Sequence, residues 1–168
     1  SSEIIKSKCL PDKKKKTDFN GLGSSNIHLN DKIYVSIGTP TQNSKLIDDL
    51  SQDKYSIFGK IIEIDKNSLD DLNLKYNIFS MGHRNPQGLT KLNDKIFSVE
   101  HGPKGGDELN FILKGKNYGW PIATFGTDYF IKYTKTDITN NSHNGFEKPI
   151  YSWGDTLGIS QLIVYKSN

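Results

Sequence analysis

Three short segments hold most of the residues whose types and spacing could do chemistry. They read GHRNPQG at 82–88, EHGPKGGDE at 100–108 and GKNYGWP at 115–121. In each segment, Gly and Pro punctuate charged, amide or aromatic side chains, a composition that suits a loop facing a ligand. The glycine-rich turn of the second segment is costly to order unless its backbone contacts something. These three loops are therefore the predicted binding surface of the protein.

Arg84 stands out in this composition. It is the only arginine among 22 basic residues, and all the others are lysine. Lysine, asparagine and isoleucine are abundant, which is typical of an AT-rich coding bias that replaces arginine wherever lysine serves. A retained arginine then indicates a position that needs a planar, bidentate and always charged group. Survival by chance is the alternative explanation.

Length and composition bound the class of protein. The chain has 168 residues, a net charge of +3, 34% hydrophobic residues and a single cysteine, Cys9. This corresponds to one or at most two domains, polar but able to fill a core, without an internal disulfide or a cysteine-based zinc site. No apolar run could span a membrane, and no secretory signal is visible. The basic run at 13–16 is interpreted as a solvated loop, so we expect no nucleic-acid partner.

The elements that must position the three loops are short strands. No segment shows a sustained helical period, and runs rich in Ile, Tyr and Phe alternate with Gly, Asn, Asp and Pro turns. These runs also recur. LNDKIYVSIG at 29–38 returns as LNDKIFSVEHG at 92–102, and IFSMG at 78–82 returns as IYSWG at 150–154. The sequence thus predicts an all-β chain that repeats one structural unit.

Each unit is predicted to contain four strands, and SQLIVY at 160–165 resembles the first strand of a third unit. The expected strands are 25–29, 32–37, 58–64 and 76–80 in the first unit, and 88–92, 95–100, 107–113 and 148–153 in the second. Tandem four-stranded units are typical of β-propeller blades, of which about four to eight close a ring. The prediction is a β-propeller fragment of two blades plus one strand. A small two-sheet β-sandwich is the alternative.

The motifs GHRNPQGL, EHGPKGGDELN and GKNYGWPIAT, in this order and spacing, resemble the soluble PQQ-dependent aldose sugar dehydrogenases of the glucose/sorbosone dehydrogenase family. The resemblance makes 20–168 a partial propeller domain and leaves 1–19 as a polar amino-terminal stretch. It implies a six-bladed β-propeller that holds pyrroloquinoline quinone (PQQ) and calcium on its broad face. It also implies a periplasmic or secreted enzyme that oxidises the anomeric carbon of an aldose sugar to a lactone, by hydride transfer to the quinone.

By this resemblance, three residues would contact the quinone. Arg84 would bind the quinone oxygens, and Asn85 and Gln87 would hydrogen-bond the edge of the cofactor. An anionic ortho-quinone that carries carboxylates needs a cation that stays charged at close range. Arginine meets that need, so the chemistry of the lone arginine agrees with the implied role.

The resemblance also implies two calcium sites. The backbone carbonyls of Gly102 and Pro103 would ligate the cofactor calcium, and Glu108, Asp107 and Tyr118 would belong to a second, structural site. Calcium takes six to eight oxygen ligands, which carbonyls in a Gly-Pro turn can supply. In the alternative interpretation, the two carboxylates cap a loop or face solvent and the tyrosine packs within its blade.

This chain departs from the family pattern at the acid–base pair. In the family, a histidine before the first strand of the preceding blade is the general base, and an aspartate of an IGD motif orients it. Aligned on KIYVSIG, these two positions hold Leu22 and Thr39. His28 lies inside a predicted strand and does not replace the base, and His143 lies in a polar stretch without a signal. His83 and His101 are expected to be turn or core histidines, so the general base stays unassigned.

Two functions remain open from the sequence. The first is a PQQ- and calcium-dependent oxidoreductase acting on sugars, which RNPQG and the lone arginine favour. The second is a non-catalytic propeller that binds calcium and a carbohydrate or protein partner, which the departure at the acid–base pair favours. GGDEL also differs by one letter from the GGDEF signature of diguanylate cyclases. No helical period precedes residue 105, so that class is rejected.

Overall fold

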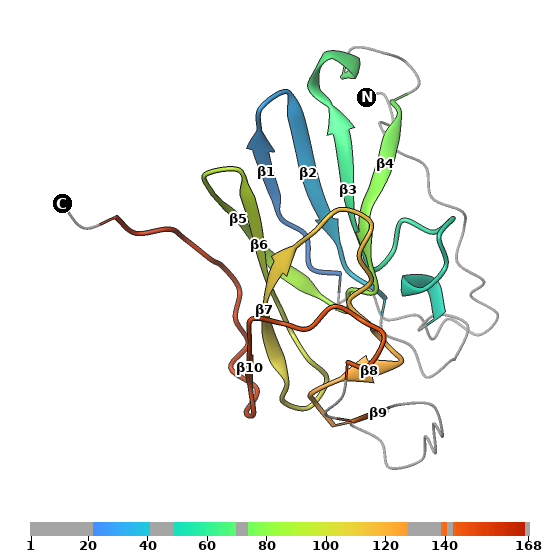
Figure 1. Cartoon of the computed structure of the whole chain (residues 1–168), viewed down its shortest axis with the longest axis vertical. Helices are drawn as coiled ribbons and strands as arrows, with labels where there is room; N and C mark the ends of the chain where they lie inside the picture. Colours follow the sequence, from blue (N-terminus) through green and yellow to red (C-terminus); the bar gives the residue numbers. More distant parts are fainter. Residues whose placement is uncertain (1–21, 41–48, 70–73, 128–138, 141–142, 167–168) are drawn as a thin grey trace.

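The computed structural model describes residues 22–40, 49–69, 74–127, 139–140 and 143–166, and the stretch 1–19 lies outside them (Figure 1). This part of the chain is nearly all strand and turn. In chain order the elements are β1 Asn26–Leu29, β2 Lys32–Ile37, η1 Asp49–Ser51, β3 Lys60–Asp65, η2 Lys66–Ser68, β4 Tyr76–Met81, β5 Pro86–Leu92, β6 Lys95–Glu100, β7 Asp107–Ile112, β8 Ala123–Thr124, β9 Thr139–Asn140 and β10 Tyr151–Trp153.

Two four-stranded antiparallel sheets form the body of the structure. Their strand orders are β1-β2-β3-β4 and β10-β7-β6-β5, so neighbouring strands follow one another in the chain, except that β8 and β9 come between β7 and β10. The predicted strands differ from the observed ones by at most three residues at either end. The prediction of two four-stranded units is therefore confirmed.

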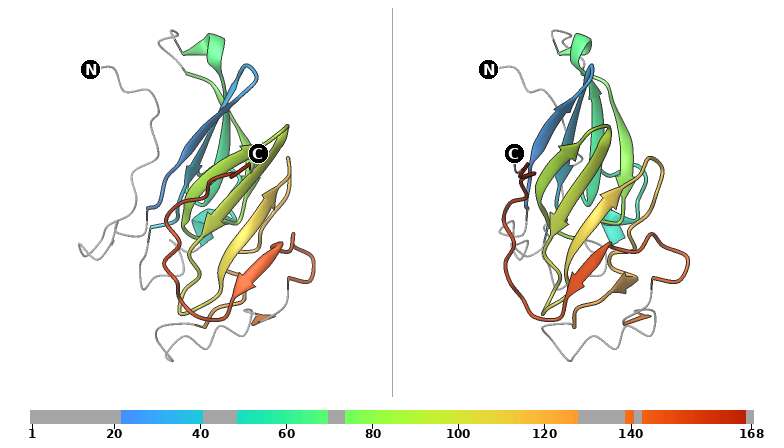
Figure 2. Two further views of the ribbon diagram at one scale, coloured as in Figure 1. Left: turned by 90° about the vertical axis from the view of Figure 1, so that its left-hand side faces the viewer. Right: turned by 60° about the vertical axis from the view of Figure 1, so that its left-hand side comes forward.

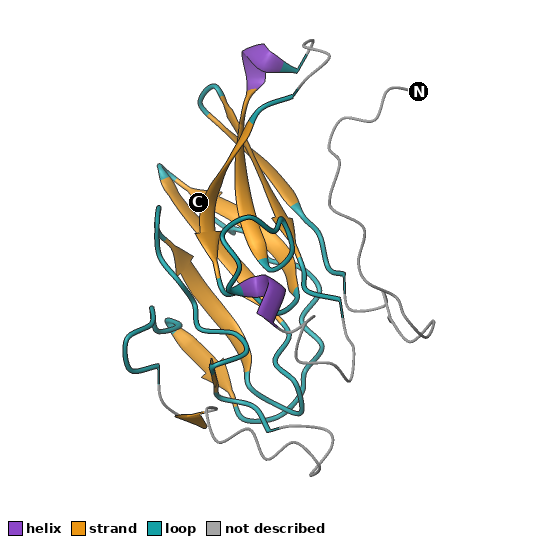
Figure 3. Cartoon of the chain, turned by 90° about the vertical axis from the view of Figure 1, so that its right-hand side faces the viewer, coloured by secondary structure: helices purple, strands orange, loops and turns teal. Residues whose placement is uncertain are grey.

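Within the described residues, helix is confined to the short 3₁₀ turns η1 and η2 outside the sheets (Figure 3). None of the helices in the described ranges is long or apolar enough to cross a membrane. A small parallel pair of strands, β8 and β9, was not foreseen from the sequence. Each of these two strands has only two residues, which is too short to leave a period-2 pattern in the sequence.

The repeated LND triplet makes the same tight hairpin in both sheets. Asn30 joins β1 to β2 and Asn93 joins β5 to β6, and both have positive φ values, 53° and 55°. Asparagine adopts this left-handed conformation more readily than most side chains, because its short amide can hydrogen-bond locally. The turn chemistry thus fixes the register of the two outer hairpins.

The apolar core joins the two sheets. One buried cluster combines Tyr34 and Ile61 of the first sheet with Leu89, Ile96 and Ile112 of the second. Strand β5 also lies against β1 and β2 (Figure 2). Because alternate residues of a strand point to opposite faces, the isoleucine-rich runs supply this core from one face of each sheet. The packing fixes the two sheets relative to each other, and with them the loops at their common end.

The prediction of a strand at 160–165 is wrong for the structure, since these residues join no sheet of the described chain. The segment is nevertheless close to β5. A Cβ atom at Gly88 would come within 3.0 Å of the amide nitrogen of Leu162. A strand forms only where a partner backbone exchanges hydrogen bonds with it.

Candidate functional site

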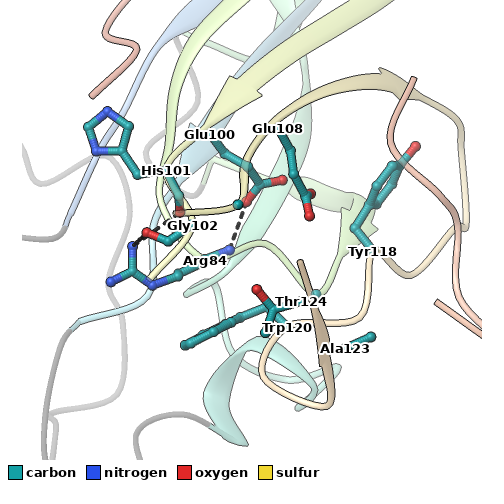
Figure 4. Close-up of a pocket in the computed structure, with 11 residues that line it drawn as sticks. Arg84, Glu100, His101, Gly102, Glu108, Tyr118, Trp120, Ala123 and Thr124 are labelled. Carbon is teal, nitrogen blue, oxygen red and sulfur yellow. Dashed lines mark hydrogen bonds between the residues drawn. The ribbon is translucent and has the colours of Figure 1, made fainter. Parts of the chain in front are cut away.

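The three loops singled out from the sequence meet in one pocket. Strand β4 ends, β5 begins, β6 ends and β7 begins at the same end of the sheets. The pocket walls come from residues within 82–84, 100–108 and 118–124 (Figure 4). The fold therefore brings together segments that are up to about forty residues apart in the chain.

Arg84 lies at one side of this pocket, with its guanidinium held over the glycine-rich turn. Its Nη1 donates hydrogen bonds to the carbonyl oxygens of Gly102, at 2.6 Å, and His101, at 3.1 Å (Figure 4). The guanidinium carbon is 5.3 Å from the centre of the Trp120 ring, within the range of a cation–π interaction. The backbone amide of Arg84 donates to the carboxylate of Glu100 at 2.9 Å. Hydrogen bonds thus hold both the backbone amide and the guanidinium of Arg84.

Asn85 and Gln87, the other two expected quinone contacts, do not line the pocket. The Asn85 Oδ1 accepts hydrogen bonds from the backbone amide of Gly23, at 2.6 Å, and from Gln87 Nε2, at 3.0 Å. The Asn85 carbonyl accepts the amide of His101 at 3.1 Å. In this structure the two amide side chains join the loop after β4 to the residues before β1.

The glycines of the 100–109 turn permit close backbone contacts within the chain. A Cβ atom at Gly106 would clash with the backbone nitrogen of Gly126, and one at Gly105 would clash with the carbonyl oxygen of Gly154. Both glycines also have positive φ, 71° and 72°. Pro103 is buried and packs against Gly126. The turn is therefore costly for a local reason, because other loops approach its backbone.

Asp107 is the acidic residue that anchors this turn. It is fully buried, and its Oδ1 accepts the amide of Gly102 at 3.0 Å. Its Oδ2 accepts the amides of Leu157, at 3.0 Å, and Gly158, at 2.8 Å. Three backbone donors therefore share its two oxygens, which matches the alternative that this carboxylate caps a loop. The contact joins the 100–108 loop to the residues after β10.

Glu108 points instead into a buried polar cluster with Glu100, Asn110 and His143. Asn110 Nδ2 bridges the two carboxylates, at 2.8 Å from Glu100 Oε1 and 3.2 Å from Glu108 Oε2. His143 Nε2 lies 3.7 Å from Glu108 Oε1, and its ring stacks on Phe125. Burial, followed by the charge of Glu100, raises the pKa of Glu108 to about 8. The cluster thus holds more acid than it can ionise without a further positive charge.

Two atoms of this cluster have unused hydrogen-bonding capacity. Asn110 Oδ1 and His143 Nδ1 are buried and have no hydrogen-bond partner. Buried polar atoms are nearly always paired, so such atoms indicate a partner such as a bound ion or water. Among the residues that the structure describes, no three Asp, Glu, His or Cys side chains are grouped as a metal site. A cation here would therefore need amide and backbone oxygens beside Glu108, which is the ligand mixture that suits calcium.

The side chain of Tyr118 packs among its neighbours, as the alternative interpretation predicts. Its Oη donates to the carbonyl of Phe111 at 2.6 Å and accepts the amide of Leu113 at 2.9 Å, and its ring stacks on His83. The residue is almost fully buried yet lines the pocket (Figure 4). With the phenol occupied by two backbone partners, the side chain of Tyr118 is not a candidate cation ligand.

Thr39 and Leu22, the positions where the resemblance predicts an acid–base pair, lie close to the Arg84 loop. Thr39 donates through Oγ1 to the carbonyl of His83 at 2.9 Å, and through its amide to the carbonyl of Arg84 at 2.7 Å. Leu22 directly precedes Gly23, which donates to Asn85. His28 lies within β1, as expected, and the structure shows it exposed. Thr39 thus acts as a support for the loop in this structure.

The sequence pointed to Arg84, Gly102, Glu108 and Tyr118, and the structure brings all four to one pocket. It also shows that the buried polar cluster around Glu108 contains three residues that were not singled out from the sequence: Glu100, Asn110 and His143. Glu100 and Asn110 belong to β6 and β7, where alternation alone would have marked them as inward-facing polar residues. His143 follows the segment 128–142 and carried no local signal.

Comparison with known proteins gives a consistent result. The family described as "Glucose / Sorbosone dehydrogenase" matches residues 2–168. The chain is 33% identical over 149 residues to aldose sugar dehydrogenase YliI of Escherichia coli (strain K12), covering 81% of this chain and 38% of that protein. It is 35% identical over 121 residues to quinoprotein glucose dehydrogenase B of Acinetobacter calcoaceticus, covering 67% and 25%.

Solved structures agree with the sequence relatives. The soluble aldose sugar dehydrogenase of E. coli in its apo-form matches with a TM-score of 0.67 and 28% identity, over 82% of this chain and 41% of that chain. The PQQ-bound aldose sugar dehydrogenase of Streptomyces coelicolor matches with a TM-score of 0.51 and 28% identity, over 73% and 32%. The chain thus spans less than half the length of the relatives it matches.

Proposed function

Since the chain belongs to the glucose/sorbosone dehydrogenase family, we propose that it forms the cofactor-holding part of a PQQ- and calcium-dependent dehydrogenase that oxidises aldose sugars. The chain contributes two four-stranded sheets and the loops between them. The carrying observation is Arg84, which is fixed at the pocket by the Gly102 carbonyl and the Trp120 ring.

Arg84 is the residue that binds the quinone in this proposal. The cofactor carries several negative charges, and a guanidinium stays ionised whatever the surrounding polarity. Its planar fork forms paired, charge-assisted hydrogen bonds to two oxygens at once. Trp120 restricts the guanidinium to one side of the pocket, which lowers the entropy lost on binding. Asn85 and Gln87 contribute to quinone binding in this proposal by fixing the loop that carries Arg84.

When bound, PQQ supplies the acceptor for the hydride that leaves the anomeric carbon of the sugar. The hydroxyl proton of that carbon must pass to a base at the same time, so that the sugar becomes a lactone. Leu22 has no titratable group, and Thr39 uses its hydroxyl to support the Arg84 loop. We therefore propose that the base comes from a position other than these two. The chain's own contribution is to orient the cofactor and to exclude water from its bound edge.

Calcium has two candidate positions in this chain. At the first, the Gly102 and Pro103 carbonyls offer neutral oxygens, and the one of Gly102 already accepts a cationic donor, Arg84. At the second, Glu108, the carbonyl of Tyr118 and the unpaired Oδ1 of Asn110 offer a carboxylate and two neutral oxygens. These donor types fit calcium. We propose that Asp107 positions the turn between the two sites, because its oxygens already accept three amides.

The test uses the full-length protein that carries this sequence, prepared free of metal and cofactor. Calcium and PQQ are added, and the quinone absorption band is followed before and after adding a panel of aldoses. Reduction of the quinone that depends on sugar supports the proposal. Failure to bind PQQ in the presence of calcium would overturn it. Arg84→Gln is measured beside wild type. Because it removes the guanidinium that binds the quinone, it should abolish any change in the quinone band that arises from this pocket.

A non-catalytic propeller that binds calcium and a carbohydrate or protein partner is the second candidate. The observation that favours it is Thr39, which occupies the position of the family's aspartate and hydrogen-bonds the loop instead of a base. Binding of PQQ without reduction, across aldoses and other polyols, would favour this candidate. Binding of calcium and an aldose without PQQ would favour it further.

We also propose a periplasmic or secreted location, which rests on the family and on the soluble E. coli relative. The test is fractionation of cells that express the full-length protein at native level. Recovery in the cytoplasmic fraction, with a cytoplasmic marker enzyme, would contradict it.

A further inference from the structure

Glu100 is a buried carboxylate at the pocket that hydrogen-bonds both the backbone of Arg84 and two buried side chains. The residue is only 4% exposed, yet it lines the pocket. Its Oε2 accepts the backbone amide of Arg84 at 2.9 Å. Its Oε1 accepts Asn110 Nδ2 at 2.8 Å and contacts His83 Nδ1 at 3.0 Å. Both oxygens are therefore committed, one of them to the loop that carries the guanidinium.

His83 fixes the orientation of this carboxylate. Because an ionised carboxylate can only accept, His83 Nδ1 must be the donor in their contact. His83 Nε2 then faces Ser80 Oγ at 2.9 Å, and the ring stacks on Tyr118 with centres 4.6 Å apart. The backbone of His83 is also held, since its amide donates to the carbonyl of Gly59 at 3.1 Å. The imidazole is thus held by contacts on both ring nitrogens and on one face.

The constellation Ser80, His83 and Glu100 has the connectivity of a serine hydrolase triad, but its location excludes that use. Ser80 is 1% exposed and His83 is 0% exposed, and neither lines the pocket. A nucleophile must reach its substrate, and Ser80 instead lies within β4, paired with Ile61 of β3. The chain of hydrogen bonds instead ends at the backbone amide of Arg84, and of its members Glu100 and Arg84 line the pocket.

A negative charge in a pocket for an anionic cofactor is unfavourable unless it has a separate task. Here the lone pairs of the Glu100 carboxylate accept hydrogen bonds from three local donors, His83, Asn110 and the backbone amide of Arg84. An amide isostere could not do the same, since its NH₂ group would face at least one of these donors.

We propose that Glu100 is a positioning residue for cofactor binding: it fixes the backbone of Arg84, and with it the aim of the guanidinium, from a carboxylate locked by His83 and Asn110. The inference rests on the proposed function in so far as the bound group is the quinone. Whether Glu100 positions Arg84 does not depend on which group binds there, and it is measured in the ligand-free protein.

The experiment compares Glu100→Gln with Glu63→Gln in the full-length protein. Glu63 is a matched control, because it is also a buried glutamate in a strand, hydrogen-bonded by Tyr34 Oη at 3.2 Å, but does not line the pocket. Two quantities are measured. The first is hydrogen exchange of the Arg84 amide in the ligand-free protein, and the second is the dissociation constant for PQQ with calcium present.

Glu100→Gln is expected to speed exchange of the Arg84 amide and to weaken PQQ binding, each by about tenfold or more. Glu63→Gln is expected to change neither by more than about twofold. If Glu100→Gln does not fold, Glu100→Asp takes its place, since the shorter side chain cannot reach His83 and Arg84 together. Exchange that equals wild type in the folded variant overturns the inference, as does an unchanged PQQ affinity. If wild type binds no PQQ, the proposed function fails while the exchange measurement still decides the role of Glu100.

Discussion

The guanidinium Nη1 of Arg84 lies 2.6 Å from the carbonyl oxygen of Gly102, so the one arginine of the chain is a direct partner of its glycine-rich turn. The sequence pointed to both residues, but for separate ligands. Their contact means that a positive charge already satisfies this carbonyl in the absence of any ligand. A quinone bound to Arg84 and a cation bound to Gly102 would therefore meet at one place.

Replacing Arg84 by lysine tests whether the fork or only its charge matters. Arg84→Lys keeps the charge but loses the paired donors and the planar contact with Trp120, so PQQ affinity should fall by at least about tenfold. The measurement is a titration followed by quinone absorbance at saturating calcium. Lys95→Arg, on β6 outside the pocket, is the control and should bind PQQ as wild type does. Equal affinities for wild type and Arg84→Lys would show that charge alone suffices.

Glu108 tests the proposed structural calcium site. In wild type, calcium at about one hundred times its dissociation constant should stabilise the fold by about 2.7 kcal/mol. Glu108→Gln removes the only carboxylate of the proposed ligand set, so this calcium-dependent rise in melting temperature should be lost. Calorimetry with and without calcium measures it. Glu63→Gln should keep the full calcium effect, and a full effect in Glu108→Gln would remove Glu108 from the site.

The pKa of Glu108 also gives stability a defined dependence on pH. Burial, followed by the charge of Glu100, raises this pKa from 4.5 to about 8. Between these two values the folded state binds more protons than the unfolded state. The free energy of unfolding of the calcium-free protein should therefore fall as pH rises from about 4.5 to 8. Denaturant titrations across this range check it, and Glu108→Gln should flatten the slope. A slope equal in both proteins would contradict the shift.

Gly106 tests whether the glycine-rich turn is fixed by backbone contacts. Gly106→Ala places a methyl group against the backbone nitrogen of Gly126, at a residue with a φ of 71°. Gly115→Ala is the matched control, because Gly115 has a similar φ of 75° but no atom near its would-be Cβ. The control should cost about 1 kcal/mol of unfolding free energy. Gly106→Ala should cost clearly more and also weaken PQQ binding. Equal costs would show that only the conformation matters.

The framework was predictable from the sequence because its signals are local. Runs rich in Ile, Tyr and Phe between turn residues marked the strands, and the repeated Asn-Asp turns marked the hairpins at Asn30 and Asn93. A lone arginine in a lysine-rich chain marked Arg84 as a position with special requirements. Each of these signals arises from residues next to one another, or from composition, and needs no knowledge of how the chain folds back.

The limits of sequence reasoning appear at 160–165, where a strand-like run is not a strand. The run has the composition of a strand, but a sheet position is a property of a pair of segments. The same applies to Asn85, whose amide was expected at a ligand and instead accepts the amide of Gly23, more than sixty residues away. The side chain was correctly placed in the loop, while its partner depended on the packing of β5 against β1.

The sequence by itself determined the two meanders, their turns and the three loops that carry Arg84, Gly102 and Glu108. Only the tertiary structure decided which residues of those loops contact one another. In it, His143 lies beside Glu108, and Asp107 accepts the amides of Leu157 and Gly158. Glu100 accepts the backbone amide of Arg84. Strand period and turn type follow from steric preferences of neighbouring residues. Buried polar partners instead follow from which loops converge when the sheets pack, and that convergence leaves no periodic trace in the chain.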